Sequence, residues 1–219
     1  MIETDVNLTR DGELVIIHDP FLDRTTTGRG FVHDYTLPEL LLFDAGSRFH
    51  PDFTGVCIPT CEETFRLFKD AGVQACFEIK GSSAAESEVI AEKLMTLFRQ
   101  YNAFEWACIS TYFPEAAARA HQVAPEVVVT RERLPDNLPF DLQDAVAQAR
   151  ILNSPVLLVD YKFLPPGGAQ DLHAEGIAVW TWNPYQETDI CQVIQQGSDG
   201  VMGDDPALAR RLVDALQVA

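Results

Sequence analysis

The sequence predicts an α/β protein with a parallel sheet of the TIM-type (β/α)8 barrel class, and three observations support this. Short apolar, β-prone runs alternate with longer stretches of helical pattern. Most runs are apolar at consecutive positions, as strands covered on both faces are. Polar side chains follow the carboxyl end of nearly every run, where barrel enzymes build their sites. An open doubly wound sheet is the competing architecture, but the Gly-rich turn of a dinucleotide-binding sheet does not follow the first run.

Seven apolar runs predict parallel strands. They are Ile2–Val6, Gln74–Ile79, Trp106–Ser110, Val127–Thr130, Val156–Asp160, Ile177–Trp182 and Gly200–Met202. A further run, Glu13–Ile17, follows the first across the turn Arg10-Asp11-Gly12, which is too short for a helix, and predicts a hairpin-like excursion. A complete barrel has eight parallel strands, so the predicted fold is a barrel without its first β/α unit.

Helix start signals stand between these runs. Three segments have the capping-box form, in which a hydroxyl residue is followed three positions later by Glu: 36–39, 60–63 and 83–86. Asp205-Pro206 offers an N-cap followed by proline at the first helical position. The predicted helices cover residues 36–43, 60–70, 84–101, 114–122, 141–150, 168–175, 186–196 and 206–217.

Residues 18–59 form a long strand–helix loop in this interpretation, with only the short helix at 36–43. A loop of this length inside a compact domain indicates a functional segment. It contains His18-Asp19-Pro20 and the polar, Gly-punctuated stretch 24–30, which is typical of a phosphate site. The whole chain, 1–219, is expected to be a single barrel domain.

Composition excludes several classes of protein. The 33 acidic and 16 basic residues give a formal net charge of −17, which disfavours nucleic-acid binding over a broad face. The apolar fraction of 47% is too high for a disordered chain. No apolar run reaches the ~18 residues of a membrane span. Five irregularly spaced cysteines are no disulfide framework, and they lead us to expect a reducing, cytoplasmic location.

Carboxylates gather at the ends of the first two parallel strands. Glu3 and Asp5 are two residues apart, so their side chains point to the same face. Glu78 lies on the next parallel strand, with Lys80 two residues further on the same face. Three converging carboxylates suit a hard divalent cation, Mg²⁺ or Ca²⁺; the alternative is a set of singly solvated rim carboxylates. Lys80 is expected either to pair with Glu78 or to hold a substrate anion.

A histidine and two tryptophans complete the candidate residues. His18 follows an apolar strand and can act as a general acid or base, although a lone histidine at a strand end more often has a structural role. Trp180 and Trp182 share one strand face. They are expected to pack a substrate's carbon skeleton, to face a choline-like cation, or simply to fill the barrel.

Taken in order, these segments resemble the signature of the glycerophosphodiester phosphodiesterase family. The similarity covers the whole chain and is densest between Glu3 and Gly30. The matching segments are Ile2–Val6, Thr9–Gly12, Val15–Asp19, Leu22–Gly30, Asp44–Gly46, Ile58–Glu63, Phe77–Lys80, Ile109–Ser110, Val179–Asn183 and Asp199–Pro206.

The resemblance implies a metal-dependent phosphodiesterase that releases glycerol 3-phosphate and an alcohol from deacylated phospholipids. Glu3, Asp5 and Glu78 match the metal ligands of the family. His18 matches one of its two catalytic histidines, and Lys80 matches a substrate-contacting lysine.

Trp180 matches a pocket aromatic of the family, whereas other positions depart from its pattern. The family opens with a strand ending in His-Arg-Gly and a Glu-Asn-Thr segment, which this sequence does not contain. Because the first catalytic histidine lies there, the chain by itself is expected to be weak or inactive. The loss of a general acid–base group typically costs ~10²–10⁴-fold in rate. Unpaired strand edges also predict a homodimer that covers the open edge of the barrel.

Two other functions fit the same residues. One is a degenerate barrel that binds glycerophosphodiesters or metal without turnover. The other is a phospholipase of a neighbouring barrel family.

Overall fold

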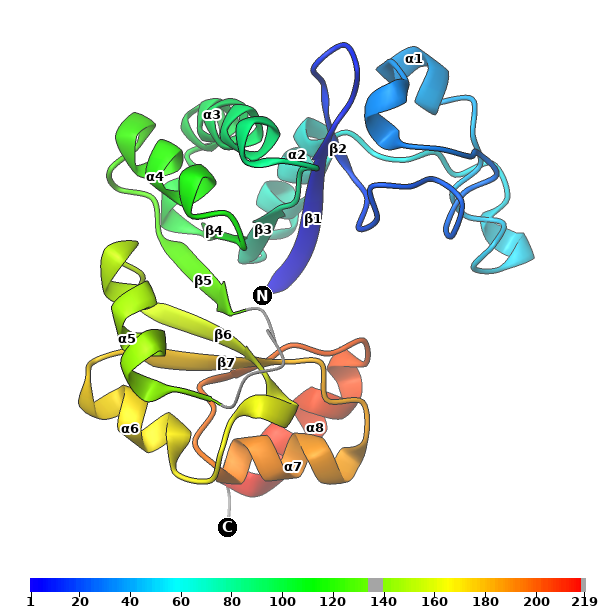
Figure 1. The fold of residues 1–219 in the computed structure, drawn as a ribbon. Coiled ribbons are helices and arrows are strands. Elements are labelled where there is room, and N and C mark those ends of the chain that lie inside the picture. Colours follow the sequence, from blue (N-terminus) through cyan, green and yellow to red (C-terminus); the bar gives the residue numbers. More distant parts are fainter. Residues whose placement is uncertain (134–139, 218–219) are drawn as a thin grey trace. The chain divides into compact units, whose positions relative to one another are not determined.

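The computed structural model of the chain describes residues 1–133 and 140–217. It divides the chain into two compact units, Met1–Val128 and Val129–Ala219 (Figure 1). No helix within the described ranges combines the length and apolar character that a membrane crossing requires.

The sheet of the first unit has the order β2-β1-β3-β4. Its strands are β1 (Ile2–Leu8), β2 (Leu14–Ile16), β3 (Ala75–Ile79) and β4 (Ala107–Thr111). Strand β2 turns back antiparallel on β1, whereas β3 pairs parallel with both β1 and β4. The predicted hairpin excursion and the first three parallel strands are therefore confirmed.

Helices α2 (Cys61–Ala71), α3 (Ala84–Tyr101) and α4 (Pro114–Val123) follow the strands of this unit. The capping box predicted at 60–63 is present: Glu63 N donates to Thr60 Oγ1 at 3.2 Å, and Thr60 N donates to Glu63 Oε2 at 2.8 Å. These reciprocal bonds satisfy backbone donors that the first turn of α2 would otherwise leave without a partner.

Aromatic packing fixes β3 against its helices. Phe77 on β3 stacks on Phe65 of α2 with ring centroids 4.3 Å apart, and both rings contact Phe98 of α3. All three side chains are fully buried. Because side chains alternate along a strand, burying Phe77 on this face directs Cys76 and Glu78 to the opposite face.

Residues 18–59 carry short elements and a small core of their own. The segment contains η1 (Val32–Asp34), α1 (Leu37–Leu40) and η2 (Pro51–Phe53). A cluster of buried apolar side chains holds it against the end of β2: Val15, Ile17, Leu22, Val32, Leu40 and Ile58. The predicted helix at 36–43 is shortened to the single turn of α1.

The second unit contains four parallel strands in the order β5-β6-β7-β8. They are β5 (Val129–Arg133), β6 (Val156–Asp160), β7 (Ala178–Trp182) and β8 (Gly200–Val201). The helices of this unit are α5 (Leu142–Ile151), η4 (Tyr161–Phe163), α6 (Gly168–Ala174), α7 (Glu187–Gln195) and α8 (Pro206–Gln217), the last of which follows β8. The predicted cap of α8 is present, since Leu208 N donates to Asp205 Oδ1 at 2.9 Å.

Strand β5 lies further along the chain than the sequence predicts. We expected it at Val127–Thr130, whereas it runs from Val129 to Arg133. Its second half contains Arg131 and Glu132, which an apolar pattern does not identify as strand. Glu132 is nevertheless buried, so a charged residue occupies an inner position of this sheet.

Candidate active site

Strand register brings the three predicted carboxylates together in the first unit. Asp5 on β1 is the direct partner of Glu78 on β3, and Glu3 lies two residues before Asp5 on the same face. One carboxylate oxygen from each residue lies within 4.8 Å of the others. Glu78 is buried, and the other two side chains are half-buried. The convergence that the sequence predicts is therefore present.

Lys80 lies directly beside this carboxylate cluster. Its Nζ atom is 3.1 Å from Asp5 Oδ1 and also contacts Glu78 Oε1. The ammonium group lies over the Tyr112 ring, 5.8 Å from its centroid. The position agrees with pairing to Glu78, one of the two roles expected for Lys80, and it brings a positive charge to the place where an anion would meet the cluster.

The donor set of the cluster fits a hard divalent cation. With three ionised carboxylates and one ammonium group, the four side chains carry two net negative charges. Oxygen atoms are the ligands that Mg²⁺ and Ca²⁺ prefer. At Ca–O distances of about 2.3–2.6 Å, two ligands of one ion stand no more than about 5 Å apart, and the observed spread meets that limit. By this measure, Glu3, Asp5 and Glu78 as they stand can hold an ion of the size of Ca²⁺, with water completing its shell.

His18 is placed by the loop that follows β2. Ile17 N, one residue earlier, donates to Asp5 O at 3.1 Å and ties the start of this loop to β1. The imidazole is largely exposed, and its Nδ1 atom lies 2.7 Å from Asp19 Oδ1. His18 therefore presents Nε2 rather than Nδ1 for chemistry.

Asp19 accepts hydrogen bonds from two side chains of this loop, those of His18 and Arg24. Arg24 Nε donates to Asp19 Oδ2 at 2.5 Å, and Arg24 Nη2 donates to Asp19 Oδ1 at 2.8 Å. These bonds lower the pKa of the Asp19 carboxyl from its ordinary value to about 2, with a smaller contribution from His18. The bonds to Asp19 in turn raise the pKa of Arg24.

Trp180, the last predicted site residue, lies on β7 in the second unit. Its half-buried ring packs against Gly200 on β8, where a Cβ atom would stand 2.7 Å from Trp180 Cδ1. This contact agrees with the filling role that the sequence left open. The role of Trp180 as a substrate contact stays a prediction.

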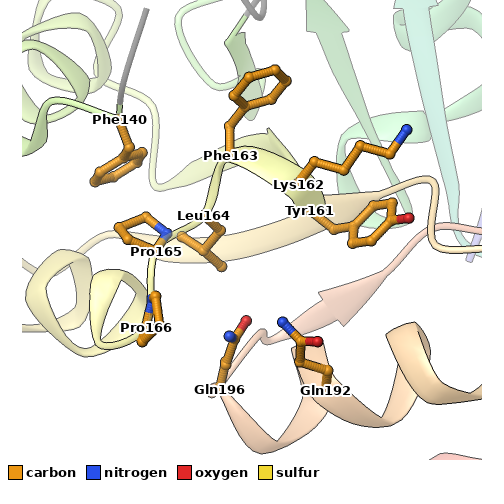
Figure 2. Close-up of a pocket in the computed structure, with 9 residues that line it drawn as sticks. All are labelled: Phe140, Tyr161, Lys162, Phe163, Leu164, Pro165, Pro166, Gln192 and Gln196. Atoms are coloured by element: carbon orange, nitrogen blue, oxygen red, sulfur yellow. The ribbon is translucent and has the colours of Figure 1, made fainter.

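The second unit also contains a cavity of about 410 Å³ (Figure 2). Aromatic and proline side chains from η4 and the loop before α6 form one wall, and two glutamines, one on α7 and one directly after it, lie opposite. The lining residues are Phe140, Tyr161, Lys162, Phe163, Leu164, Pro165, Pro166, Gln192 and Gln196. None of the predicted site residues is among them.

Sequence reasoning missed two side chains at the candidate site. Arg24 stood out only as part of a polar loop, and no pattern pointed to Tyr112. The adjacency of His18 and Asp19 was the one available signal. Loop spacing does not reveal that Arg24 folds back onto Asp19, and the Lys80–Tyr112 contact depends on where β4 ends.

The fold and these residues together define the class of protein: a barrel-type α/β protein with an acidic, cation-compatible site on its first two parallel strands. A model of the "Glycerophosphoryl diester phosphodiesterase family" matches residues 1–208. The chain belongs to this family, whose members generally use divalent cations. The resemblance inferred from the sequence and the predicted fold class are thus confirmed.

Individual relatives agree with this assignment. A glycerophosphodiester phosphodiesterase of Caldanaerobacter subterraneus is 33% identical, over 97% of this chain and 85% of the relative. A glycerophosphodiester phosphodiesterase of Bacillus subtilis is 27% identical, over 96% and 75%. The solved structure of an Oleispira antarctica phosphodiesterase in complex with sn-glycerol-3-phosphate superimposes with a TM-score of 0.87 at 25% identity, covering 97% of this chain and 84% of that one.

Proposed function

We propose that this protein hydrolyses glycerophosphodiesters to glycerol 3-phosphate and an alcohol in a reaction that depends on Mg²⁺ or Ca²⁺. The observation that carries the proposal is the cluster of Glu3, Asp5 and Glu78 within 4.8 Å, with Lys80 against it. Membership of a phosphodiesterase family supports the reaction class. The bound sn-glycerol-3-phosphate of the Oleispira relative supports the product.

The four residues of the cluster would bind and orient the phosphodiester. Glu3, Asp5 and Glu78 would hold the cation, which supplies charge neutralisation at the phosphoryl oxygens when bound. Lys80 would provide a second positive contact for the phosphate. A lysine here acts as a compact point charge and suits the three-dimensional spread of phosphoryl oxygens.

His18 would supply a proton to the leaving alcohol. The P–O bond to the alcohol breaks as a new P–O bond forms to the nucleophile, which is water or a hydroxyl group of the substrate's own glycerol. The proton on His18 Nε2 passes to the departing alkoxide oxygen, and the proton that the nucleophile loses passes to solvent water, from which His18 regains a proton. Where the glycerol hydroxyl attacks, water opens the resulting cyclic phosphate in a second step to give glycerol 3-phosphate. The contact of Nδ1 with Asp19 supports this role, because it leaves Nε2 as the ring nitrogen that can face the leaving group.

The direct test follows glycerophosphocholine, glycerophosphoethanolamine and intact phosphatidylcholine by ³¹P NMR with Mg²⁺, with Ca²⁺ and with a chelator. We expect the glycerophosphodiesters to yield glycerol 3-phosphate only when a cation is present. Asp5→Asn is expected to remove this activity. Asp70→Asn, which changes an exposed carboxylate of α2 in the same unit, is the matched control and should leave it intact.

Two results would contradict the proposal. Cleavage of intact phosphatidylcholine in preference to its deacylated form would identify a phospholipase. Calorimetric binding of the cation and of glycerophosphocholine without any turnover, even at high enzyme concentration, would identify a binding protein.

A further inference from the structure

The loop from residue 18 to residue 30 contains a chain of three charged or titratable side chains. Asp19 stands in the middle, bonded to His18 through Oδ1 and to Arg24 through both oxygens. Its side chain is only 20% exposed, whereas the side chains of His18 and Arg24 are each 62% exposed. The Asp19 carboxylate is thus largely shielded from solvent, and it links the exposed side chains of His18 and Arg24.

Buried neighbours hold Arg24 in place from both sides. Leu22 and Thr26 are fully buried, and Thr26 donates to Leu22 O through its backbone N at 3.0 Å and its Oγ1 at 2.8 Å. Leu22 N donates in turn to Gly30 O at 2.9 Å. These bonds close a turn with Arg24 at its middle, so the backbone that presents the guanidinium is fixed independently of His18.

The chemistry of Asp19 decides which nitrogen of His18 carries a proton. An ionised carboxylate only accepts hydrogen bonds, so His18 must donate to it through Nδ1–H. The other ring nitrogen, Nε2, is then the one that takes up and releases a proton. Rotation of the Asp19 carboxylate would remove this preference, because a free imidazole exchanges between its two tautomers.

We infer that Arg24 is a positioning residue for His18: its two-bond contact fixes the plane of the Asp19 carboxylate, which in turn fixes the ring orientation and tautomer of His18. A guanidinium group makes two parallel hydrogen bonds to a carboxylate, whereas a lysine ammonium makes contact as a point charge. Charge alone therefore does not replace Arg24. The inference rests on the proposed role of His18 for its consequence in catalysis, but the geometry itself is independent of that role.

Arg24 also has an electrostatic interaction with a charged group outside this loop. Its guanidinium interacts over a distance with Asp5, a member of the carboxylate cluster. Loss of one exposed charge at such a distance changes binding by no more than about 5-fold. A small change in cation affinity is thus expected from Arg24→Gln, and it is separable from the effect on His18.

The test measures the His18 tautomer by ¹⁵N NMR of the full chain at about pH 8.5, above the ordinary range of histidine titration. The resonance is assigned by its loss in His18→Gln. We expect wild-type His18 to carry its proton on Nδ1. In Arg24→Gln and Arg24→Lys, the Nδ1 resonance should shift toward that of an unprotonated ring nitrogen.

The matched control is Arg10→Gln. Arg10 also bonds a carboxylate in this part of the chain, Glu39 Oε2 at 2.7 Å, but it does not touch His18 or Asp19. It should leave the His18 spectrum unchanged. Circular dichroism of each variant checks that the fold is retained.

Activity gives a second readout. Arg24→Gln should lower kcat about 10-fold with little change in KM, the lower end of what outer hydrogen-bond partners of functional side chains contribute. An unchanged His18 spectrum in folded Arg24→Gln, or full restoration by Arg24→Lys, would overturn the inference. An inactive wild-type chain with the expected tautomer shift would overturn the proposed function and leave this inference standing.

Discussion

The carboxylate cluster and the His18 loop place the side chains of the candidate site by different means. Glu3, Asp5 and Glu78 stand on β1 and β3, where strand register and the buried rings behind β3 decide which way each side chain points. His18 stands on a loop and depends on side-chain bonds to Asp19 and Arg24. The backbone orients the first group, whereas a chain of polar contacts orients the second.

This difference predicts how each region responds to change. Removing a member of the cluster leaves the others in place but destroys the ligand set. Removing Arg24 or Asp19 from the hydrogen-bonded series in the loop allows the side chain that it held to move. Variants of each region therefore test whether the backbone or the side-chain hydrogen bonds orient the site. The expected loss of activity or stability decreases from the cluster to the loop.

The largest effect is expected from the double variant Glu3→Gln/Glu78→Gln. Two of the three anionic ligands disappear, so calorimetry with Mg²⁺ or Ca²⁺ should detect no binding. Turnover should fall by at least about 10³-fold, since the charge that stabilises the transition state goes with the ion. Unchanged cation affinity in a folded double variant would show that the cluster is not the cation site.

The next effect is expected from His18→Gln. Loss of the proposed proton donor should reduce turnover of glycerophosphocholine about 10²-fold, while cation affinity stays the same. A glycerophosphodiester with a 4-nitrophenyl leaving group needs no proton on departure, so the variant should lose much less activity on it. An equal loss on both substrates would argue against His18 as the acid.

The smallest effect is expected in stability at low pH. The pKa of Asp19 lies at about 2 in the folded chain, below its ordinary value of 3.8. A group with a lowered pKa in the folded state stabilises that state above its unfolded value, and the contribution is lost as the pH falls from about 4 to about 2. For this partly exposed ion pair, we expect less than about 1 kcal/mol.

Urea unfolding between pH 5 and pH 2.5 measures this contribution. The free energy of unfolding of Asp19→Asn should fall less steeply over this range than that of the wild type. Asp44→Asn is an informative comparison, because backbone N–H groups of Ser47, Gly55 and Gly46 also lower the pKa of Asp44 to about 2. Identical slopes for Asp19→Asn and the wild type would show that the Arg24 contact is not retained in solution.

Most strands and helices could be predicted because their apolar residues are buried and their helix-start residues form the expected caps. The run from Ala75 to Ile79 is apolar except for Glu78, and the capping box at Thr60 and Glu63 forms as its sequence indicates. Strand β5 was misplaced because Arg131 and Glu132 contradict the apolar pattern. The pairing of this strand with β6, which no local pattern encodes, determines its extent.

The candidate site also contains residues that the sequence pattern places and residues that only the tertiary structure places. The side-chain period of two along β1 is sufficient to place Glu3 and Asp5 on one face. The loop residue Arg24 has no such period to reveal its partner. Strand alternation also predicts that Lys80 lies beside Glu78, as the structure shows, but its contact with the Tyr112 ring depends on where the end of β4 lies in three dimensions.

Hydrophobic periodicity and strand alternation act locally along the chain, so they were sufficient to predict the fold class and the convergence of the three carboxylates. The family was inferred from the resemblance of ordered segments to its signature. The meeting of the loop side chains depends instead on the three-dimensional fold. Arg24 reaches Asp19, and Asp19 reaches His18, because the buried Leu22 and Thr26 fold the loop back on itself. Leu22 is buried in a cluster with Leu40 and Ile58, which are distant in sequence, and this packing rather than the spacing of the loop residues sets the geometry.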